Sequence, residues 1–195
     1  MLKYILISLL VLAVIWACTN NTRPADTTAN AAEPKTEVAT PKVDRAEAEQ
    51  LVAEYDFIVA ASPNGDTLTV APFSFTLDLT AEAEEKLRDR EESIIVAAYL
   101  TGLPKDKQNE SFLKEGTQYL ASPEIEVMEE REVTFEGVKI ARADFAGLVD
   151  RDFTVTINIY SGRRSYQNNI LDGEVPVESI SDMVKEKRIL RVELL

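Results

Sequence analysis

The chain has 195 residues with 34 acidic and 21 basic side chains, one cysteine and no histidine, and its formal net charge is −13. The lack of histidine excludes Ser-His-Asp and Cys-His triads and histidine-containing zinc sites, and one cysteine cannot form an internal disulfide or a multi-thiolate metal site. The excess of acid disfavours binding to nucleic acid or to anionic lipid, since both require clustered Lys and Arg.

The N-terminus begins with a short apolar segment that ends at the only cysteine. Lys3 supplies a positive charge, and Ser8 is the one clearly polar residue of the run 4–17. At a helical rise of about 1.5 Å per residue this run spans about 21 Å, which is less than the roughly 30 Å of a hydrocarbon core. The pattern therefore predicts the hydrophobic part of a signal peptide and not a permanent membrane span.

The tetrapeptide Ile15-Trp16-Ala17-Cys18 closes this run and resembles the lipobox of a bacterial lipoprotein, although Trp16 stands where a small residue is usual. The resemblance implies that residues 1–17 are a signal peptide cleaved before Cys18. It also implies that Cys18 carries a thioether-linked diacylglycerol and an acylated amine. Two or more acyl chains hold a protein on a membrane stably.

We therefore expect a protein that is lipid-anchored in the bacterial cell envelope, at the outer membrane, on its periplasmic side or at the surface. A cleaved secretory signal with an incidental cysteine and an uncleaved N-terminal anchor are the alternatives.

Residues 18–44 are expected to be a disordered tether. They contain no aromatic residue, and Val38 and Val43 are their only large apolar residues, so they cannot bury enough surface to offset the entropy of ordering. The motif Asp26-Thr27-Thr28 resembles an O-glycosylation acceptor of some bacterial periplasmic systems, and a plain linker is the alternative.

Residues 45–195 are long enough for one domain with its own core. Their periodicity and their turn residues predict elements in the following order. Helices are expected over 45–54 and 81–90, and strands over 55–61, 73–79, 93–100, 125–128, 133–135, 138–145, 153–160 and 189–194. Thr80 is expected to cap the second helix, and Asn64-Gly65 to form a tight turn.

About seven or eight strands with turn signals, one short inserted helix and no regular strand–helix alternation indicate a mainly β protein. We predict an antiparallel β-sandwich with Ig-like or related topology that follows the signal peptide and the disordered linker. The pattern does not distinguish a sandwich from a barrel. Residues 160–171 and 93–102 resemble segments of uncharacterised exported bacterial proteins, a likeness that implies no function.

A polar segment after strand 153–160 is the candidate binding site. Loops at the end of a sandwich often carry binding residues, and arginine presents a planar fork of donors that suits a carboxylate or a sugar. The candidate residues are Arg163, Arg164, Tyr166, Asn168 and Asn169. The alternative is that the arginines pair with acids of the domain itself and that the asparagines form turns.

Three aspartates near Gly147 are a weak candidate for a calcium site, because calcium is bound by loop carboxylates. They are Asp144, Asp150 and Asp152. No D-x-[DN]-x-[DN]-G loop is visible, and ordinary solvated acids are the alternative. Otherwise we expect no metal and no cofactor.

These observations predict a lipid-anchored envelope lipoprotein with a non-catalytic β-sandwich that binds a partner or has a structural role. The partner is expected to be the membrane through the acyl chains on Cys18, together with an envelope protein, a glycan or peptidoglycan, and not nucleic acid. A hydrolase or lyase built on carboxylates is one alternative, and a calcium-dependent adhesion module is another.

Overall fold

The computed structural model describes residues 45–195, which belong to one compact unit. The predicted signal peptide, Cys18, the tether and Asp26-Thr27-Thr28 lie outside the described residues. Among residues 45–195, no helix combines the length and the apolar character that crossing a membrane requires.

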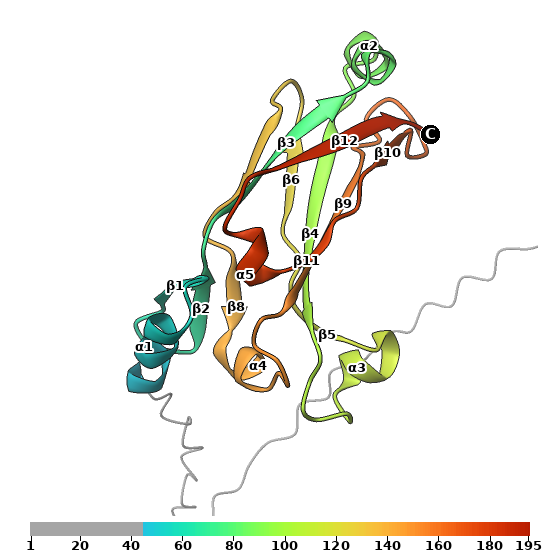
Figure 1. The fold of residues 1–195 in the computed structure, drawn as a ribbon. Coiled ribbons are helices and arrows are strands. Elements are labelled where there is room, and N and C mark those ends of the chain that lie inside the picture. The colour runs from blue at the N-terminus through green and yellow to red at the C-terminus, as the bar shows by residue number, and fades with distance from the viewer. Residues whose placement is uncertain (1–44) are drawn as a thin grey trace, which may run out of the picture. The chain divides into compact units, whose positions relative to one another are not determined.

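The described residues form twelve strands and five short helices, so the mainly β prediction is confirmed. In chain order they are α1 (Arg45–Glu54), β1 (Ile58–Ala61), β2 (Thr67–Val70), β3 (Phe73–Leu79), α2 (Ala81–Asp89), β4 (Ile94–Gly102), α3 (Glu110–Glu115), β5 (Gln118–Ala121), β6 (Glu124–Val127), β7 (Glu132–Phe135), β8 (Lys139–Ala141), α4 (Arg142–Ala146), β9 (Thr154–Ser161), β10 (Leu171–Gly173), β11 (Val177–Ser179), α5 (Ile180–Met183) and β12 (Arg188–Leu194) (Figure 1).

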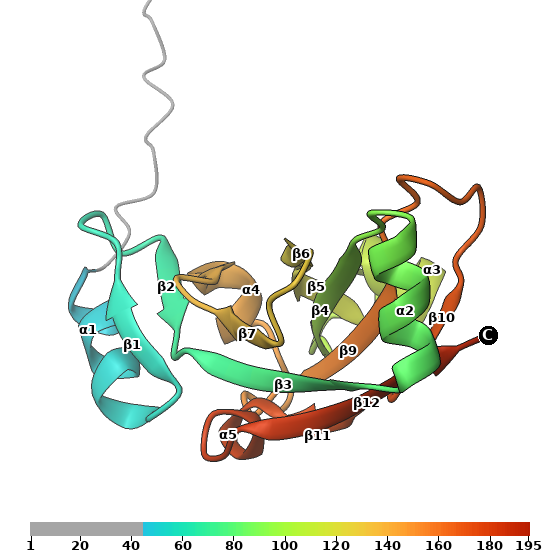
Figure 2. The same ribbon diagram turned by 90° about the horizontal axis from the view of Figure 1, so that it is seen from above.

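Two sheets form the sandwich. The four-stranded sheet has the order β10-β12-β3-β7, and the five-stranded sheet has the order β11-β9-β4-β5. β5 and β6 pair with the same edge of β4, β6 along its first half and β5 along its second half. Seen from above, β3 and β12 lie on one side and β4, β5 and β6 on the other (Figure 2). The sheets approach closely where Gly173 of β10 meets Ile159 of β9, because a Cβ on Gly173 would lie 2.6 Å from the Ile159 side chain.

The core lies between the two sheets and follows from the alternation of the sequence. Phe73, Phe75 and Leu77 of β3 are buried, while Ser74 and Thr76 between them face outward. The eight residues of β9 alternate in the same way, with Val155, Ile157 and Ile159 buried. A strand places successive side chains on opposite faces, so each of these strands gives one face to the core.

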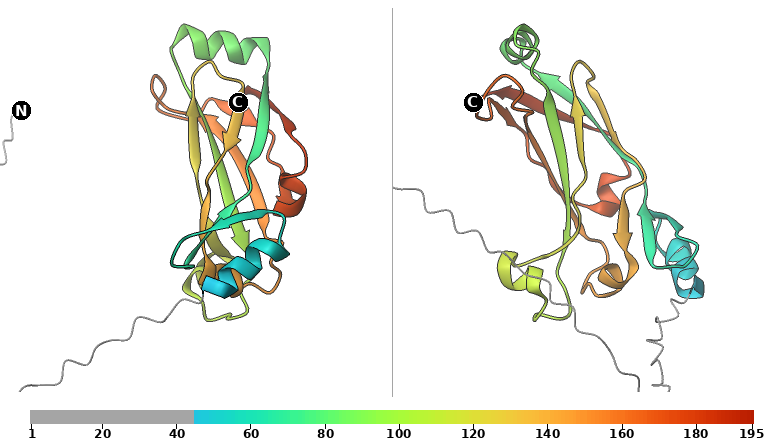
Figure 3. Two further views of the ribbon diagram at one scale, coloured as in Figure 1. Left: turned by 90° about the vertical axis from the view of Figure 1, so that its left-hand side faces the viewer. Right: turned by 180° about the vertical axis from the view of Figure 1, so that it is seen from behind.

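A third sheet, of order β1-β2-β8, carries α1 and α4 with it and extends the core at one end of the sandwich. Tyr55, Phe57, Phe145 and Phe153 meet there with ring centroids 5.4 to 6.4 Å apart, mostly edge to face. Helix α2 lies at the opposite end, as Figures 1 and 3 show. The loop between β9 and β10 lies at the α2 end, because it bonds to Arg90 and Glu92.

One strand pair departs from the antiparallel prediction. β12 pairs with β3 in parallel, with Leu190 opposite Leu77, and it lies between β3 and β10 in the four-stranded sheet. A parallel neighbour requires a long crossover connection, and a pairing so distant in sequence leaves no signal in local periodicity.

Two further predictions need correction. The strand count of seven or eight was too low, because the four missed strands have only three or four residues each and show little periodicity; they are β2, β5, β10 and β11. The strand expected over 138–145 ends at Ala141, and Arg142–Ala146 form helix α4. Helix α4 places the Phe145 side chain in the core, where it is fully buried. A continued strand would have carried it past the end of the three-stranded sheet.

Candidate functional site

The loop 162–170 between β9 and β10 is organised by one buried carboxylate. Glu92, 1% exposed at the entry to β4, accepts hydrogen bonds from four backbone N–H groups. The donors are those of Ser93, Arg164, Ser165 and Tyr166, at 3.0, 3.0, 2.7 and 3.3 Å. Burial acts to raise the pKa of Glu92, but the four donors outweigh burial and hold this pKa below its ordinary value.

Arg164 is occupied by an acid of the domain. Its Nε lies 2.7 Å from Oε1 of Glu126 on β6, and Ser93 Oγ donates to the same oxygen at 2.5 Å. The hydrogen bond from Arg164, with that from Ser93, lowers the pKa of Glu126. The loop passes so close to β4 that a Cβ on Gly162 would lie 1.9 Å from Ser93 Oγ, so only glycine fits there.

Asn169 forms a turn, as the alternative interpretation proposed. Its Oδ1 accepts from the N–H of Ser161 at 2.8 Å and of Leu171 at 3.1 Å, and its Nδ2 donates to the Leu171 carbonyl at 2.7 Å. Tyr166 lies against α2, with Lys86 Nζ 5.5 Å from its ring centroid. Within residues 45–195 its buried hydroxyl has no hydrogen-bond partner. Asn168 is exposed.

Arg163 differs from its neighbour Arg164. It is exposed, its backbone has a φ of 59°, and its guanidinium makes no ion pair or hydrogen bond with any residue between 45 and 195. Positive φ is uncommon for a residue other than glycine and indicates a locally constrained backbone. Of the two arginines, Arg163 is therefore the one that is available to a ligand.

Arg163 borders a groove of about 530 Å³ on the outer face of the five-stranded sheet. The main lining side chains are Ile95, Tyr99, Asn158, Tyr160, Arg163 and Asn169. In the register of β4 and β9, Tyr160 lies opposite Ile95 and Asn158 opposite Ala97. Directly paired residues have Cβ atoms about 4.5–5.5 Å apart, so these side chains form one continuous surface. The sequence predicted Arg163 and Asn169 here and missed Tyr99, Asn158 and Tyr160.

A hydrogen bond to Glu124 of β6 fixes the Tyr160 ring in this groove. Tyr160 Oη donates to Glu124 Oε1 at 2.8 Å. Burial, followed by the hydrogen bond to Glu124 and its charge, raises the pKa of Tyr160 to about 12. The phenol therefore keeps its proton at neutral pH and acts as a donor, not as a base.

A second hollow of about 210 Å³ lies between α2 and the connection from β6 to β7. Its lining is dominated by opposite charges that include Glu84, Arg88, Glu91 and Arg131. Arg131 contacts Glu84 at 3.4 Å and also donates to the Glu129 carbonyl at 2.9 Å. Arg131 is thus held by the protein itself, and the hollow presents charges of both signs.

The three candidate calcium ligands do not come together. Asp144 accepts from Gln118 Nε2 at 2.8 Å, and Asp150 accepts from the N–H of Asp152 at 3.0 Å. Asp152 accepts from the backbone and hydroxyl of Ser181 at 3.0 and 2.7 Å. Within the described part of the chain no group of three or more acidic, Cys or His side chains could hold a metal ion. The weak calcium candidate is therefore not supported.

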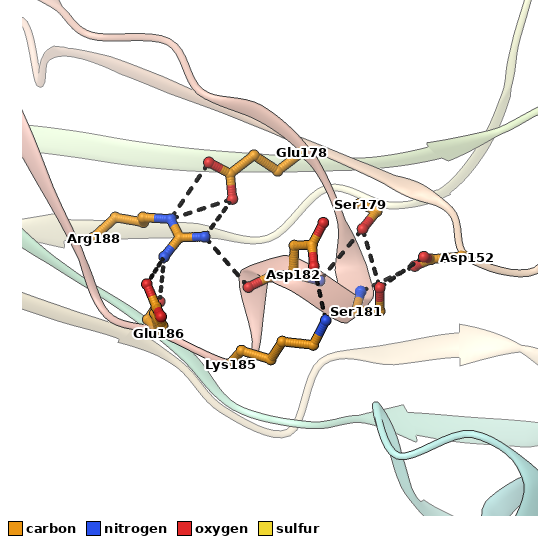
Figure 4. A network of polar contacts seen from close by, with 8 residues as sticks. All are labelled: Asp152, Glu178, Ser179, Ser181, Asp182, Lys185, Glu186 and Arg188. Carbon is orange, nitrogen blue, oxygen red and sulfur yellow. Dashed lines mark hydrogen bonds and ion pairs between the residues drawn. The ribbon is translucent and has the colours of Figure 1, made fainter.

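Asp152 instead belongs to a polar network that joins the two sheets around α5 (Figure 4). Arg188 of β12 donates to Glu178 of β11, with Nη2 2.9 Å from Oε2, and so links the four-stranded sheet to the five-stranded sheet. In α5, Asp182 pairs with Lys185 at 2.8 Å. The network holds the fold together through the ion pairs of Arg188 and Lys185, while Asp152 is held by hydrogen bonds from Ser181.

The fold and its groove thus define a β-sandwich with an open polar and aromatic sheet face. No family model, no curated protein and no solved structure matches this chain.

Proposed function

We propose that this chain is a lipid-anchored protein of the bacterial cell envelope whose β-sandwich binds a ligand without transforming it. One observation supports the binding role. The groove on the outer face of the five-stranded sheet is lined by two tyrosines, an asparagine and an arginine, and this arginine has no ion-pair partner within residues 45–195. Sites that combine aromatic surface with a few placed polar groups are typical of ligand recognition.

The side chains of the groove favour recognition over catalysis. Tyr160 is protonated at neutral pH because its pKa is about 12. Ser161, the one serine of the groove lining, is fully buried and its hydroxyl donates a hydrogen bond to Asn169. The remaining polar side chains of the lining are the Tyr99 hydroxyl, two amides and the Arg163 guanidinium, which are hydrogen-bonding groups. An envelope glycan, peptidoglycan or envelope protein is the expected class of partner.

The anchoring half of the proposal rests on the lipobox resemblance at Cys18, and a labelling experiment tests it. Cells that express the full chain are fed an alkyne fatty acid, and the protein is analysed by mass spectrometry and membrane fractionation. We expect the Cys18→Ala variant to lose the label and to be either left uncleaved or released from the membrane. Cleavage before Cys18 also removes Trp16, the only tryptophan, so the mature protein should show tyrosine fluorescence alone. Equal labelling of both proteins would refute lipidation at Cys18.

The binding half is tested by photo-crosslinking in cells. A photoreactive residue is placed at Thr156, which lies opposite Tyr99 on the groove face, or at Ile189 of β12, which is 69% exposed and serves as the control. We expect crosslinked envelope material from position 156 that disappears when Tyr99→Ala is added, and none from position 189. The same yield from both positions would contradict a binding role for the groove.

A further inference from the structure

The groove over β4 and β9 offers three kinds of contact within one surface. Tyr99 and Tyr160 supply aromatic rings, Asn158 supplies an amide that both donates and accepts, and Arg163 supplies a positive charge. Strand register fixes their spacing, since Asn158 and Tyr160 lie two residues apart on the same face of β9. Tyr99 lies opposite Thr156, which is the next residue along that face. Two central strands therefore hold the tyrosines and Asn158, and the loop 162–170 adds Arg163 at the border of the surface.

Aromatic rings and amides together suit a sugar. The C–H faces of a pyranose ring are apolar and pack flat on a tyrosine ring, while its hydroxyls require partners that both donate and accept hydrogen bonds. Tyr160 is preset for such stacking, because its hydroxyl is bound to Glu124 at 2.8 Å and its ring orientation is fixed before a ligand arrives. Preorganisation of this kind lowers the entropy cost of binding.

The charges select among sugars. The two acids closest to the groove on β6 are engaged, Glu124 by Tyr160 and Glu126 by Arg164. Arg163 has no such partner among residues 45–195, so its guanidinium faces the groove as a cation. A guanidinium forms its strongest hydrogen bonds with a carboxylate. A densely charged polyanion fits less well, because only one arginine lines the groove and the whole chain has a net charge of −13.

We propose that the groove binds an oligosaccharide that carries a carboxylate, with its rings on Tyr99 and Tyr160, its hydroxyls at Asn158 and its carboxylate at Arg163. This inference rests on the proposed binding function and names the ligand class of the same site. The carboxylate can belong to a uronic acid or to the lactyl group of N-acetylmuramic acid in glycan strands from which the stem peptide has been removed, and the two sources share the chemistry that Arg163 recognises.

The test is isothermal titration of the full chain in detergent with two probes, each offered as the free acid and as its methyl ester. One probe is the disaccharide of N-acetylglucosamine and N-acetylmuramic acid, and the other is a disaccharide of glucuronic acid and N-acetylglucosamine. We expect at least one free acid to bind about tenfold or more tightly than its ester, the loss that follows from removing one charge-assisted hydrogen bond. The tighter of the two acids identifies the source of the carboxylate.

Two variants assign the effect to Arg163. Arg163→Asn should bring the affinity for the acid down to that for the ester and leave the affinity for the ester unchanged. Asparagine tolerates positive φ, so the backbone at 59° is retained. Arg191→Ala removes one positive charge from an exposed position on β12 and should leave both affinities unchanged. Equal melting temperatures of the two variants and the wild type show that neither substitution disturbs the fold.

Three results would each overturn the inference. They are equal affinity for acid and ester, an Arg163→Asn variant that binds the acid as well as the wild type does, and no binding of any disaccharide. The crosslinking at position 156 separates that failure from a failure of the proposed function. Crosslinked material that depends on Tyr99 would leave the groove a binding site for another ligand, and its absence would remove both proposals.

Discussion

Glu92 shows how one buried residue can fix the conformation of a loop. Its carboxylate lies under the loop 162–170 and accepts hydrogen bonds from four backbone N–H groups, three of them in the loop. The loop therefore closes on the start of β4. The cost of burying a charge is offset when the charge is fully hydrogen-bonded. The Arg163 side chain projects from this loop beside the groove, so its position depends on an acid that does not itself line the groove.

Replacing Glu92 by glutamine should lower the free energy of unfolding by about 1–3 kcal/mol at neutral pH, because an amide nitrogen then faces buried N–H donors. The folded-state pKa of Glu92 is depressed, so its contribution to stability is complete above its ordinary pKa of 4.5 and is lost as pH falls from there through the depressed value. The gap between wild type and variant should therefore shrink below about pH 4.5.

Urea unfolding of both proteins at several pH values measures this gap. Glu85→Gln makes the same chemical change at an exposed position of α2 and serves as the control, with an expected effect within about 0.5 kcal/mol. A Glu92→Gln gap that stays constant from neutral pH down to acid would contradict the assignment of a depressed pKa to this carboxylate.

The residues at the groove show which features of the candidate site the sequence could not predict. Arg163 and Arg164 are indistinguishable in the sequence, and only the fold brings Glu126, 38 positions away, to one of them. Asn169 looked like a ligand-binding amide, yet its side chain is used by its own turn. The alternation of β9 did place Asn158 and Tyr160 on the solvent side, but it held no information on whether that face would stay open.

At the scale of elements, long periodic segments were predicted well and short ones were not. The helix over 45–54 and the strand over 73–79 have the bounds that the sequence predicted. In contrast, β10 and β11 have three residues each and exist because neighbouring strands pair with them. Such elements are set by tertiary pairing, which overrides local propensity.

The N-cap of α2 is confirmed and gives a prediction at this scale. Thr80 has an extended backbone, and its hydroxyl accepts from the N–H of Ala83 at 3.3 Å. Thr80→Ala should cost about 1 kcal/mol of unfolding free energy, because one N–H at the helix start loses its partner. Thr80→Ser keeps the oxygen and should cost less in the same chemical denaturation experiment. Equal losses in the two variants would indicate that the threonine acts through its methyl group.

For the whole molecule, the parallel pairing of β12 with β3 is the pairing on which the topology most depends. β12 is hydrogen-bonded on both sides and gives Leu190 and Val192 to the core, where they are 2% and 0% exposed. Arg188 at its start also ties the two sheets together through Glu178. Both sides of the sandwich therefore depend on a single segment.

A chain that stops at Lys187 should not unfold cooperatively, because it lacks a central strand and leaves β3 and β10 without a partner between them. Urea titration followed by circular dichroism should show a broad or absent transition, with aggregation at higher protein concentration. Deletion of Leu195 alone, which is 75% exposed, is the control and should unfold as the full chain does. A sharp two-state transition in the shortened chain would contradict the central role of β12.

The order in which the ribosome makes these strands has a consequence for synthesis. β3 ends at Leu79 and its parallel neighbour begins at Arg188, more than a hundred residues later. Pairing over such a separation is slow, and the four-stranded sheet cannot close until residues 188–194 have been made. The four-stranded sheet, and with it the core between the two sheets, therefore stays incomplete through most of translation.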